Sequence, residues 1–199
     1  MKLLLFSDVH CSVRHCQALV AAAEEVDLVV GAGDLGNVRS GLERTVAVLR
    51  RIQRPTVLVP GNNESYDELV EACLDWPSAL VLHGSGTELL GRKFYGVGGG
   101  IPVTPFGNWS YDFDEAEAER LLADCPPQAV LVTHSPPAGV VDVSSSGQSL
   151  GSQAIRRAVL ERKPALCVCG HIHGSGGRRD WLGETPVVNA GPDGVVWTL

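Results

Sequence analysis

The sequence has no long hydrophobic run and comparatively little charge. Of its 199 residues, 44% are hydrophobic and only 20% are Asp, Glu, Lys or Arg. The apolar stretch near the N-terminus, Leu3–Phe6, is too short for the core of a signal peptide, and no stretch approaches the length of a membrane span. We therefore expect a cytoplasmic protein that makes no use of a membrane. No low-complexity tract or sustained charge run is present, so we expect little disorder.

The sequence also lacks a basic excess. Its 16 Lys and Arg residues stand against 23 Asp and Glu residues, which gives a formal net charge of −7. A surface of this sign repels polyanions on average, so tight non-specific binding of nucleic acid is not expected. A small anionic substrate remains compatible with this charge if bound divalent cations outweigh it locally. A homo-oligomer is also compatible with the sequence, which does not decide the oligomeric state.

Zinc-finger spacing is absent as well, although the chain contains six cysteines. Cys167 and Cys169 flank Val168 in an apolar run, where cysteine behaves as a small buried hydrophobic residue. We therefore expect these thiols to serve packing in a reducing compartment, and no metal site needs them.

The hydrophobic pattern alternates between strands and helices, which predicts an α/β fold. The length suits one well-buried core, so we expect a single domain over residues 1–199. Glycine turns are expected at Gly84, Gly86 and Gly91, and the tail from Gly174 to Leu199 is expected to form a strand meander. The predicted strands are Lys2–Phe6, Asp27–Val30, Thr56–Val59, Leu80–Leu82, Glu88–Leu90, Lys93–Val97, Ala129–Thr133 and Ala165–Cys169, and the predicted helices are Cys11–Glu25, Gly41–Ile52, Tyr66–Leu74, Asp114–Ala123 and Ser152–Arg162.

Side chains that can bind metals follow five of these strands directly. Because α/β sheets place their sites at the carboxyl ends of strands, these side chains are expected to meet. Carboxylate, amide and imidazole donors together suit Mn, Fe, Zn, Ni or Mg, and a soft thiolate is not required. The candidate ligands are Asp8, His10, Asp34, Asn62, His134, His171 and His173.

Taken singly, these motifs have ordinary explanations. Asp8-Val9-His10 could be a helix-capping region, with Ser12 or Asp8 as the cap. Gly61-Asn62-Asn63-Glu64 could be a turn, because Gly and Asn tolerate left-handed backbone. His134 could be a loop histidine, and the pair in Gly170-His171-Ile172-His173 could be a solvated surface pair. The common position of all five segments at strand ends favours a shared metal site.

A second interpretation concerns Gly31-Ala32-Gly33-Asp34-Leu35-Gly36, which matches the dinucleotide-binding pattern G-x-G-x-x-G. Two features oppose a dinucleotide. Asp34 would place a carboxylate beside the pyrophosphate, and no acidic residue ends the next strand, near Thr56–Pro60. A glycine-flanked Asp at a strand end is instead well placed to bridge two cations.

The motifs D-x-H, G-D, G-N-x-E, T-H and G-H-x-H, in this order, resemble the calcineurin-like metallophosphoesterase superfamily. The likeness extends from Asp8 to Asn189-Ala190-Gly191-Pro192, and its nearest branch is the small, single-domain, phosphodiesterase-like one. The resemblance implies a four-layer αββα sandwich of two mixed β-sheets flanked by helices. It also implies a division of ligands, with Asp8, His10 and His173 on one metal, Asn62, His134 and His171 on the other, and Asp34 bridging them.

One position departs from the family pattern. The fuller motif reads G-N-H-[DE], and its His is commonly assigned to protonating the leaving group, whereas this chain has Asn63. An amide can donate a hydrogen bond to a phosphoryl oxygen but cannot deliver a proton. We therefore expect Asn63, together with Asp34, to act in catalysis, and we expect monoester hydrolysis to suffer. Glu64 is expected to support the site without binding a metal.

These observations predict a hydrolase for phosphodiesters, in which a hydroxide bridging two divalent metals, Mn being favoured, attacks the phosphorus. The substrate is expected to be a small phosphorylated molecule, selected by the loops Gly98–Asn108 and Val140–Gly151. Arg156-Arg157 and Arg178-Arg179 could contact phosphate or be solvated surface charge. The alternatives are a phosphomonoesterase or nucleotidase of the same fold and a binding scaffold without activity.

Overall fold

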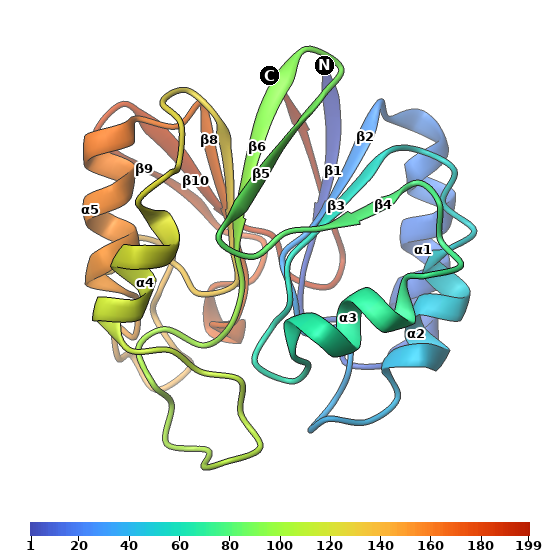
Figure 1. Ribbon diagram of the computed structural model, residues 1–199, viewed down its shortest axis with the longest axis horizontal. Helices are drawn as coiled ribbons and strands as arrows, with labels where there is room; N and C mark the ends of the chain where they lie inside the picture. Colours follow the sequence, from blue (N-terminus) through green and yellow to red (C-terminus); the bar gives the residue numbers. More distant parts are fainter.

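Two mixed β-sheets pack face to face in the computed structural model, which describes residues 1–199, and helices cover the outer face of each sheet (Figure 1). This arrangement is the predicted four-layer α/β sandwich. The first sheet has the order β11-β1-β2-β3-β4. Its strands are β1 (Lys2–Phe6), β2 (Leu28–Gly31), β3 (Thr56–Leu58), β4 (Ala79–Val81) and β11 (Val195–Thr198).

The second sheet has the order β5-β6-β7-β8-β10-β9. Strands β6, β7, β8 and β10 run parallel, and an antiparallel strand lies at each edge. Its strands are β5 (Ser85–Leu89), β6 (Arg92–Val97), β7 (Val130–Thr133), β8 (Leu166–Cys169), β9 (Arg179–Leu182) and β10 (Thr185–Asn189).

Five helices and two short 3-10 turns complete the layers. The first sheet is covered by helices from the first third of the chain, and the second by α4 and α5, as Figure 1 shows at opposite sides of the molecule. None of the helices combines the length and apolar character that crossing a bilayer requires. The helical segments are α1 (Val13–Ala22), η1 (Ala23–Glu25), α2 (Leu42–Leu49), α3 (Tyr66–Ala72), α4 (Glu115–Leu122), α5 (Gln153–Arg162) and η2 (His173–Ser175).

Alternation along the strands explains why both faces of each sheet are buried. In β1, Leu4 and Phe6 pack under the helices of the first sheet, whereas Leu3 and Leu5 pack between the two sheets. Successive strand residues point to opposite faces, so one apolar run supplies two layers of core. The predicted strands therefore agree with the structure wherever a short run is fully apolar.

Two local predictions were wrong, one of them in part. Gly86 is not a turn residue: it lies within β5, opposite Tyr95 of β6, because the Arg92–Val97 strand extends the pairing past it. The tail is a meander only in part: β9 and β10 pair antiparallel on either side of Gly183, but the next strand leaves this sheet. Strands β9 and β10 join the second sheet, whereas β11 crosses to the first sheet and pairs with β1, with Leu3 opposite Trp197. Between the chain ends, the amino group of Met1 donates to the Leu199 carbonyl at 3.2 Å.

The cysteines behave as the composition predicts. All six are free thiols, and Cys167 and Cys169 are fully buried in β8. Ser12 caps α1 by accepting a hydrogen bond from the backbone N–H of His15 at 3.4 Å, so the capping expected of this segment is present.

Candidate metal centre

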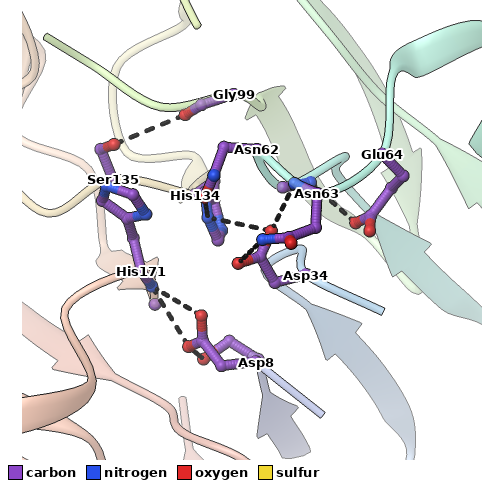
Figure 2. A network of polar contacts seen from close by, with 12 residues as sticks. Asp8, Asp34, Asn62, Asn63, Glu64, Gly99, His134, Ser135 and His171 are labelled. Atoms are coloured by element: carbon purple, nitrogen blue, oxygen red, sulfur yellow. Dashed lines mark hydrogen bonds and ion pairs between the residues drawn. The ribbon is translucent and has the colours of Figure 1, made fainter. Parts of the chain in front are cut away.

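The seven candidate ligands leave the carboxyl ends of five neighbouring strands and converge on one place. Asp8 and His10 follow β1, Asp34 follows β2, and Asn62 follows β3. From the second sheet, His134 follows β7, and His171 and His173 follow β8. The two sheets thus contribute to one site, which lies at the carboxyl ends of their strands (Figure 2).

The first group of ligand atoms belongs to Asp8, His10, Asp34 and His173, and all of these atoms lie within 4.8 Å of one another. The Nε2 atoms of His10 and His173 are 3.0 Å apart. His10 Nε2 is 3.5 Å from Asp34 Oδ2, and His173 Nε2 is 3.7 Å from Asp8 Oδ1. His173 is exposed, so this group is open to solvent on one side.

The second group belongs to Asp34, His134 and His171, whose ligand atoms also lie within 4.8 Å of one another. Asn62 joins it, because its Oδ1 is 3.2 Å from His134 Nε2. The same nitrogen is 3.4 Å from Asp34 Oδ1. Asp34 is the only residue common to both groups, so its two carboxylate oxygens face different sets of donors.

Several of these residues have a strained backbone. The φ angles are 55° at Asp8, 41° at His10, 57° at Asp34 and 64° at His171. Non-glycine residues seldom adopt this left-handed region, and strain of this kind concentrates at functional sites. The sharp turns direct four side chains back into the space between the strand ends.

Glycines allow the chain segments to approach closely. A Cβ added at Gly61 would lie 2.0 Å from Asp34 Oδ1, and one at Gly170 would lie 2.5 Å from Ser7 Oγ. Neither position can hold a larger residue without displacing the side chain beside it. The glycines of the G-N-x-E and G-H-x-H motifs are thus part of the site geometry.

Backbone carbonyls and hydroxyls orient the ligands. His134 Nδ1 donates to the Ala32 carbonyl at 2.7 Å, and His10 Nδ1 donates to the Gly36 carbonyl at 3.2 Å. Each bond leaves the Nε2 lone pair directed into the site. Asp8 is fixed by Ser7 Oγ, which donates to Oδ2 at 2.5 Å, and by the His171 N–H at 3.0 Å from Oδ1 (Figure 2).

The charges of the buried groups depend strongly on one another. Burial raises the pKa of Asp8. Burial by itself would also raise the pKa of Asp34, but the adjacent His134 and His10 rings hold it well below its usual range. Burial opposes protonation of His134, yet the adjacent Asp34 carboxylate raises the pKa of His134 to about 9. Burial and the neighbouring His134 lower the pKa of His171 to about 3. Positive charge is thus favoured beside Asp34, where a divalent cation could replace the proton.

Asn63 lies beside the candidate ligand Asp34, and its side chain contacts protein groups. Its Nδ2 donates to Asp34 Oδ2 at 2.7 Å, and its Oδ1 accepts from the Val38 N–H at 2.7 Å. The backbone N–H of Asn63 also donates to Asp34 Oδ1 at 2.9 Å. Because Asp34 and the Val38 N–H engage both ends of the buried amide, Asn63 positions Asp34 in this conformation.

Glu64 lies outside both ligand groups and joins two loops. Its carboxylate accepts from the N–H groups of Leu35 at 3.1 Å, Gly36 at 2.9 Å and Gly61 at 2.9 Å. Burial and the charge of Asp34 raise the pKa of Glu64, whereas these three donors favour its ionised form. The loop that carries Asp34 is thereby held against the loop that carries Asn62.

Sequence reasoning missed Ser110 and understated Asn189. Ser110 Oγ accepts from Asn62 Nδ2 at 3.0 Å, which turns Asn62 Oδ1 toward His134. No local motif marks Ser110, which lies 48 positions away in the chain. Asn189 resembles part of a family motif in the sequence, which does not indicate its contacts. Its Nδ2 donates to the carbonyls of Gly170 at 3.1 Å and Ile172 at 3.2 Å, and these bonds hold the loop that carries His171 and His173.

The arginines that could have bound phosphate have protein partners or remain exposed. Arg156 donates to the Ala138 carbonyl at 2.7 Å, and Arg157 forms an ion pair with Glu119. Arg178 and Arg179 are exposed. The first pair is therefore engaged by partners within the protein.

Several known proteins are similar to this chain in sequence. A sequence model of the calcineurin-like phosphoesterase superfamily domain matches residues 1–197. Metallophosphoesterase domain-containing protein 1 of Homo sapiens is 32% identical over 139 residues, which cover 67% of this chain and 39% of that protein. A fungal protein, the probable rhamnogalacturonate lyase C of Emericella nidulans, is 28% identical over 167 residues, which cover 76% of this chain but only 16% of that protein. The chain thus spans well under half the length of these relatives.

Solved structures share the fold. The protein TT1561 of Thermus thermophilus superposes with a TM-score of 0.75 at 21% identity, over 96% of this chain and 90% of its own. Phosphopantetheinyl hydrolase of Mycobacterium tuberculosis superposes with a TM-score of 0.59 at 17% identity, over 96% of this chain and 88% of its own. At these identities the likeness concerns the fold alone.

Proposed function

This chain belongs to the calcineurin-like phosphoesterase superfamily, and on that premise we propose that it hydrolyses phosphodiesters with two divalent metal ions, Mn²⁺ being favoured. The observation that carries the proposal is the pair of ligand groups that share Asp34. Asp8, His10 and His173 would hold one ion, and Asn62, His134 and His171 would hold the other. Asp34 would bridge them.

The donor set fits divalent cations. His10 Nδ1 donates to the Gly36 carbonyl, so in a neutral His10 ring the Nε2 atom carries a lone pair. This Nε2 lies 3.0 Å from the Nε2 of His173. Two nitrogen lone pairs at this separation require a proton or a cation between them. Mixed imidazole, carboxylate and amide donors suit Mn, Fe, Zn, Ni or Mg.

When bound, the two ions would neutralise the phosphoryl oxygens and lower the pKa of a water molecule toward neutrality. The protein's own groups would fix the donors. Asn63 and Glu64 hold Asp34 and its loop, and the Ala32 and Gly36 carbonyls fix the tautomers of His134 and His10.

The preference for diesters rests on a missing acid. A monoester brings a second negative charge, and a poor leaving group needs a proton donor. The amide of Asn63 is not acidic enough to protonate a leaving group, and it is hydrogen-bonded to Asp34 and to the backbone N–H of Val38. Diesters with activated leaving groups depend least on such a donor, so the substrate we propose is a small phosphodiester. Tight non-specific binding of nucleic acid is not part of this proposal, because the net charge is −7.

The test is metal-dependent turnover. Purified protein would be stripped with a chelator, reconstituted with Mn²⁺, and assayed with bis-(p-nitrophenyl) phosphate and p-nitrophenyl phosphate, with metal content from elemental analysis. We expect two ions per chain, no hydrolysis without metal, and a higher kcat/KM for the diester. Full activity in metal-free protein would refute the proposal. A clear preference for the monoester would favour a phosphomonoesterase, and metal binding without any turnover would favour a binding scaffold.

A further inference from the structure

The long loop between β6 and α4 carries two aromatic rings packed on one another. The rings of Phe106 and Trp109 are stacked, with centroids 5.7 Å apart and planes inclined by 15°. Phe106 is 52% exposed, so this aromatic pair lies at the surface and is not part of the core. Figure 1 shows this loop extending at the bottom of the view, beyond the lower end of the sheets where the strands of the site terminate.

The loop is attached to the candidate metal centre itself. Ser110, the neighbour of Trp109, accepts from the ligand Asn62 at 3.0 Å. Consecutive Cα atoms are about 3.8 Å apart, so the aromatic pair begins one residue from a contact with a metal ligand. Asp112 fixes the base of the loop, since Thr104 Oγ1 donates to its Oδ2 at 2.6 Å and Ser110 Oγ donates to its Oδ1 at 2.8 Å.

A second attachment comes from the opposite sheet. Arg39, on the loop after β2, donates to the Trp109 carbonyl at 3.5 Å and forms an ion pair with Glu68 at 2.8 Å. The aromatic loop is therefore anchored at Trp109 and Ser110, against Arg39 and the candidate ligand Asn62.

The two long loops beside the site carry no basic residue. Neither loop 101–112 nor loop 138–151 contains a lysine or an arginine, and Arg39 is already paired with Glu68. Nothing on these loops would bind a second phosphate. Large hydrophobic side chains on the strand-end loops are instead exposed, namely Val38, Val103, Phe106, Val143 and Leu150.

We propose that Phe106 and Trp109 form a stacking platform for a planar aromatic ester group of the substrate, whose single phosphate lies at the metal ligands. The position of the phosphate rests on the function proposed above. Stacking of a planar ring on an aromatic side chain contributes about 1–3 kcal/mol, which corresponds to roughly 5- to 150-fold in affinity. The platform thus selects for the ester group, while the ligands select for the phosphate.

The experiment is an equilibrium titration of the Mn²⁺-loaded protein with phenyl phosphate, cyclohexyl phosphate and methyl phosphate. All three probes carry one phosphate, and only phenyl phosphate has a planar ring. We expect phenyl phosphate to bind about tenfold more tightly than methyl phosphate, with cyclohexyl phosphate between them. In Phe106→Ala the advantage of phenyl phosphate should fall to about threefold or less, with methyl phosphate unchanged.

Val103→Ala is the matched control, because Val103 is 62% exposed on the same loop and has no stacking partner. It should retain the phenyl advantage, and thermal unfolding should show that both variants are folded. Equal affinity for all three probes in the unchanged protein would overturn the platform, and so would equal weakening of all three in Phe106→Ala. Cyclohexyl phosphate binding as tightly as phenyl phosphate would overturn the aromatic class. Turnover of bis-(p-nitrophenyl) phosphate tests the hydrolase separately, so failure of the proposed function can be distinguished from failure of the stacking platform.

Discussion

Replacement of Asn63 by alanine separates two roles for this residue. In the structure its amide donates to Asp34 Oδ2 and accepts from the Val38 N–H, each at 2.7 Å. The alternative, which the sequence suggests, is an amide that contacts the phosphoryl oxygen of the substrate. The first role predicts a change in metal binding, whereas the second predicts a change in turnover alone.

The magnitude follows from the two lost hydrogen bonds. A hydrogen bond to a carboxylate contributes about 1.5–3 kcal/mol, and one between neutral groups contributes about 0.5–1.5 kcal/mol. We expect Asn63→Ala to lower the free energy of unfolding by about 2–4 kcal/mol, since Asn63 is buried and both bonds are lost. Groups that orient metal ligands typically change metal affinity by about 10- to 100-fold, so Mn²⁺ should bind that much more weakly.

Calorimetric titration of the metal-free protein with Mn²⁺ measures the affinity, and thermal unfolding without metal measures the stability. Asn108→Ala is the control, because Asn108 is an exposed asparagine with no contact to a ligand. Unchanged Mn²⁺ affinity in Asn63→Ala, combined with a large loss of kcat on bis-(p-nitrophenyl) phosphate, would refute the positioning role. It would then place the amide on the substrate.

Three further expectations concern other residues. Asp34→Asn should reduce kcat by roughly a thousandfold or more, because it would weaken both proposed metal positions. Asp180→Asn, on the exposed part of β9, should have little effect and serves as the control. Two tightly bound ions and normal turnover in the Asp34 variant would contradict a bridging role for Asp34. Cys167→Ala and Cys169→Ala should each lower the free energy of unfolding by about 1–2 kcal/mol and leave the metal content intact, and loss of metal from a folded variant would show that a thiol is a ligand. Because burial raises the pKa of Cys167 to about 12, its thiol stays protonated at about pH 8, and iodoacetamide should label the native chain at Cys11 alone, as mass spectrometry can verify.

The fold could be predicted where a short apolar run is buried on both faces. Lys2–Phe6 matches β1, and the predicted strands near residues 28–31, 56–58, 130–133 and 166–169 agree within one or two residues. Pairing across the tail could not be predicted, because Val195–Thr198 alternates between half-buried and exposed residues and would fit either sheet. Its partner is decided by the packing of the whole chain.

The convergence of the candidate ligands could be predicted because each one follows a strand directly. The contacts that orient them could not, since they join residues distant in the chain. Asn63 is a clear case: its residue type suggested a donor to substrate, and the structure adds that one N–H of its amide donates to the carboxylate of Asp34, 29 positions earlier. Ser110 gave no signal at all, since a lone serine in a loop is common, and only the fold brings it to Asn62.

The pairing of β1 with β11 has a consequence for how the site is assembled during folding. Strand β1 positions Asp8 and His10, yet one of its edges pairs with residues near the other end of the chain, Leu3 with Trp197. Contacts between such distant residues form slowly, because a long loop must close before they contribute. At a synthesis rate of about 5–20 residues per second, β1 waits roughly ten seconds or more for this partner. The candidate ligands Asp8 and His10 are therefore expected to reach their final geometry late, after the parallel core of the first sheet has formed.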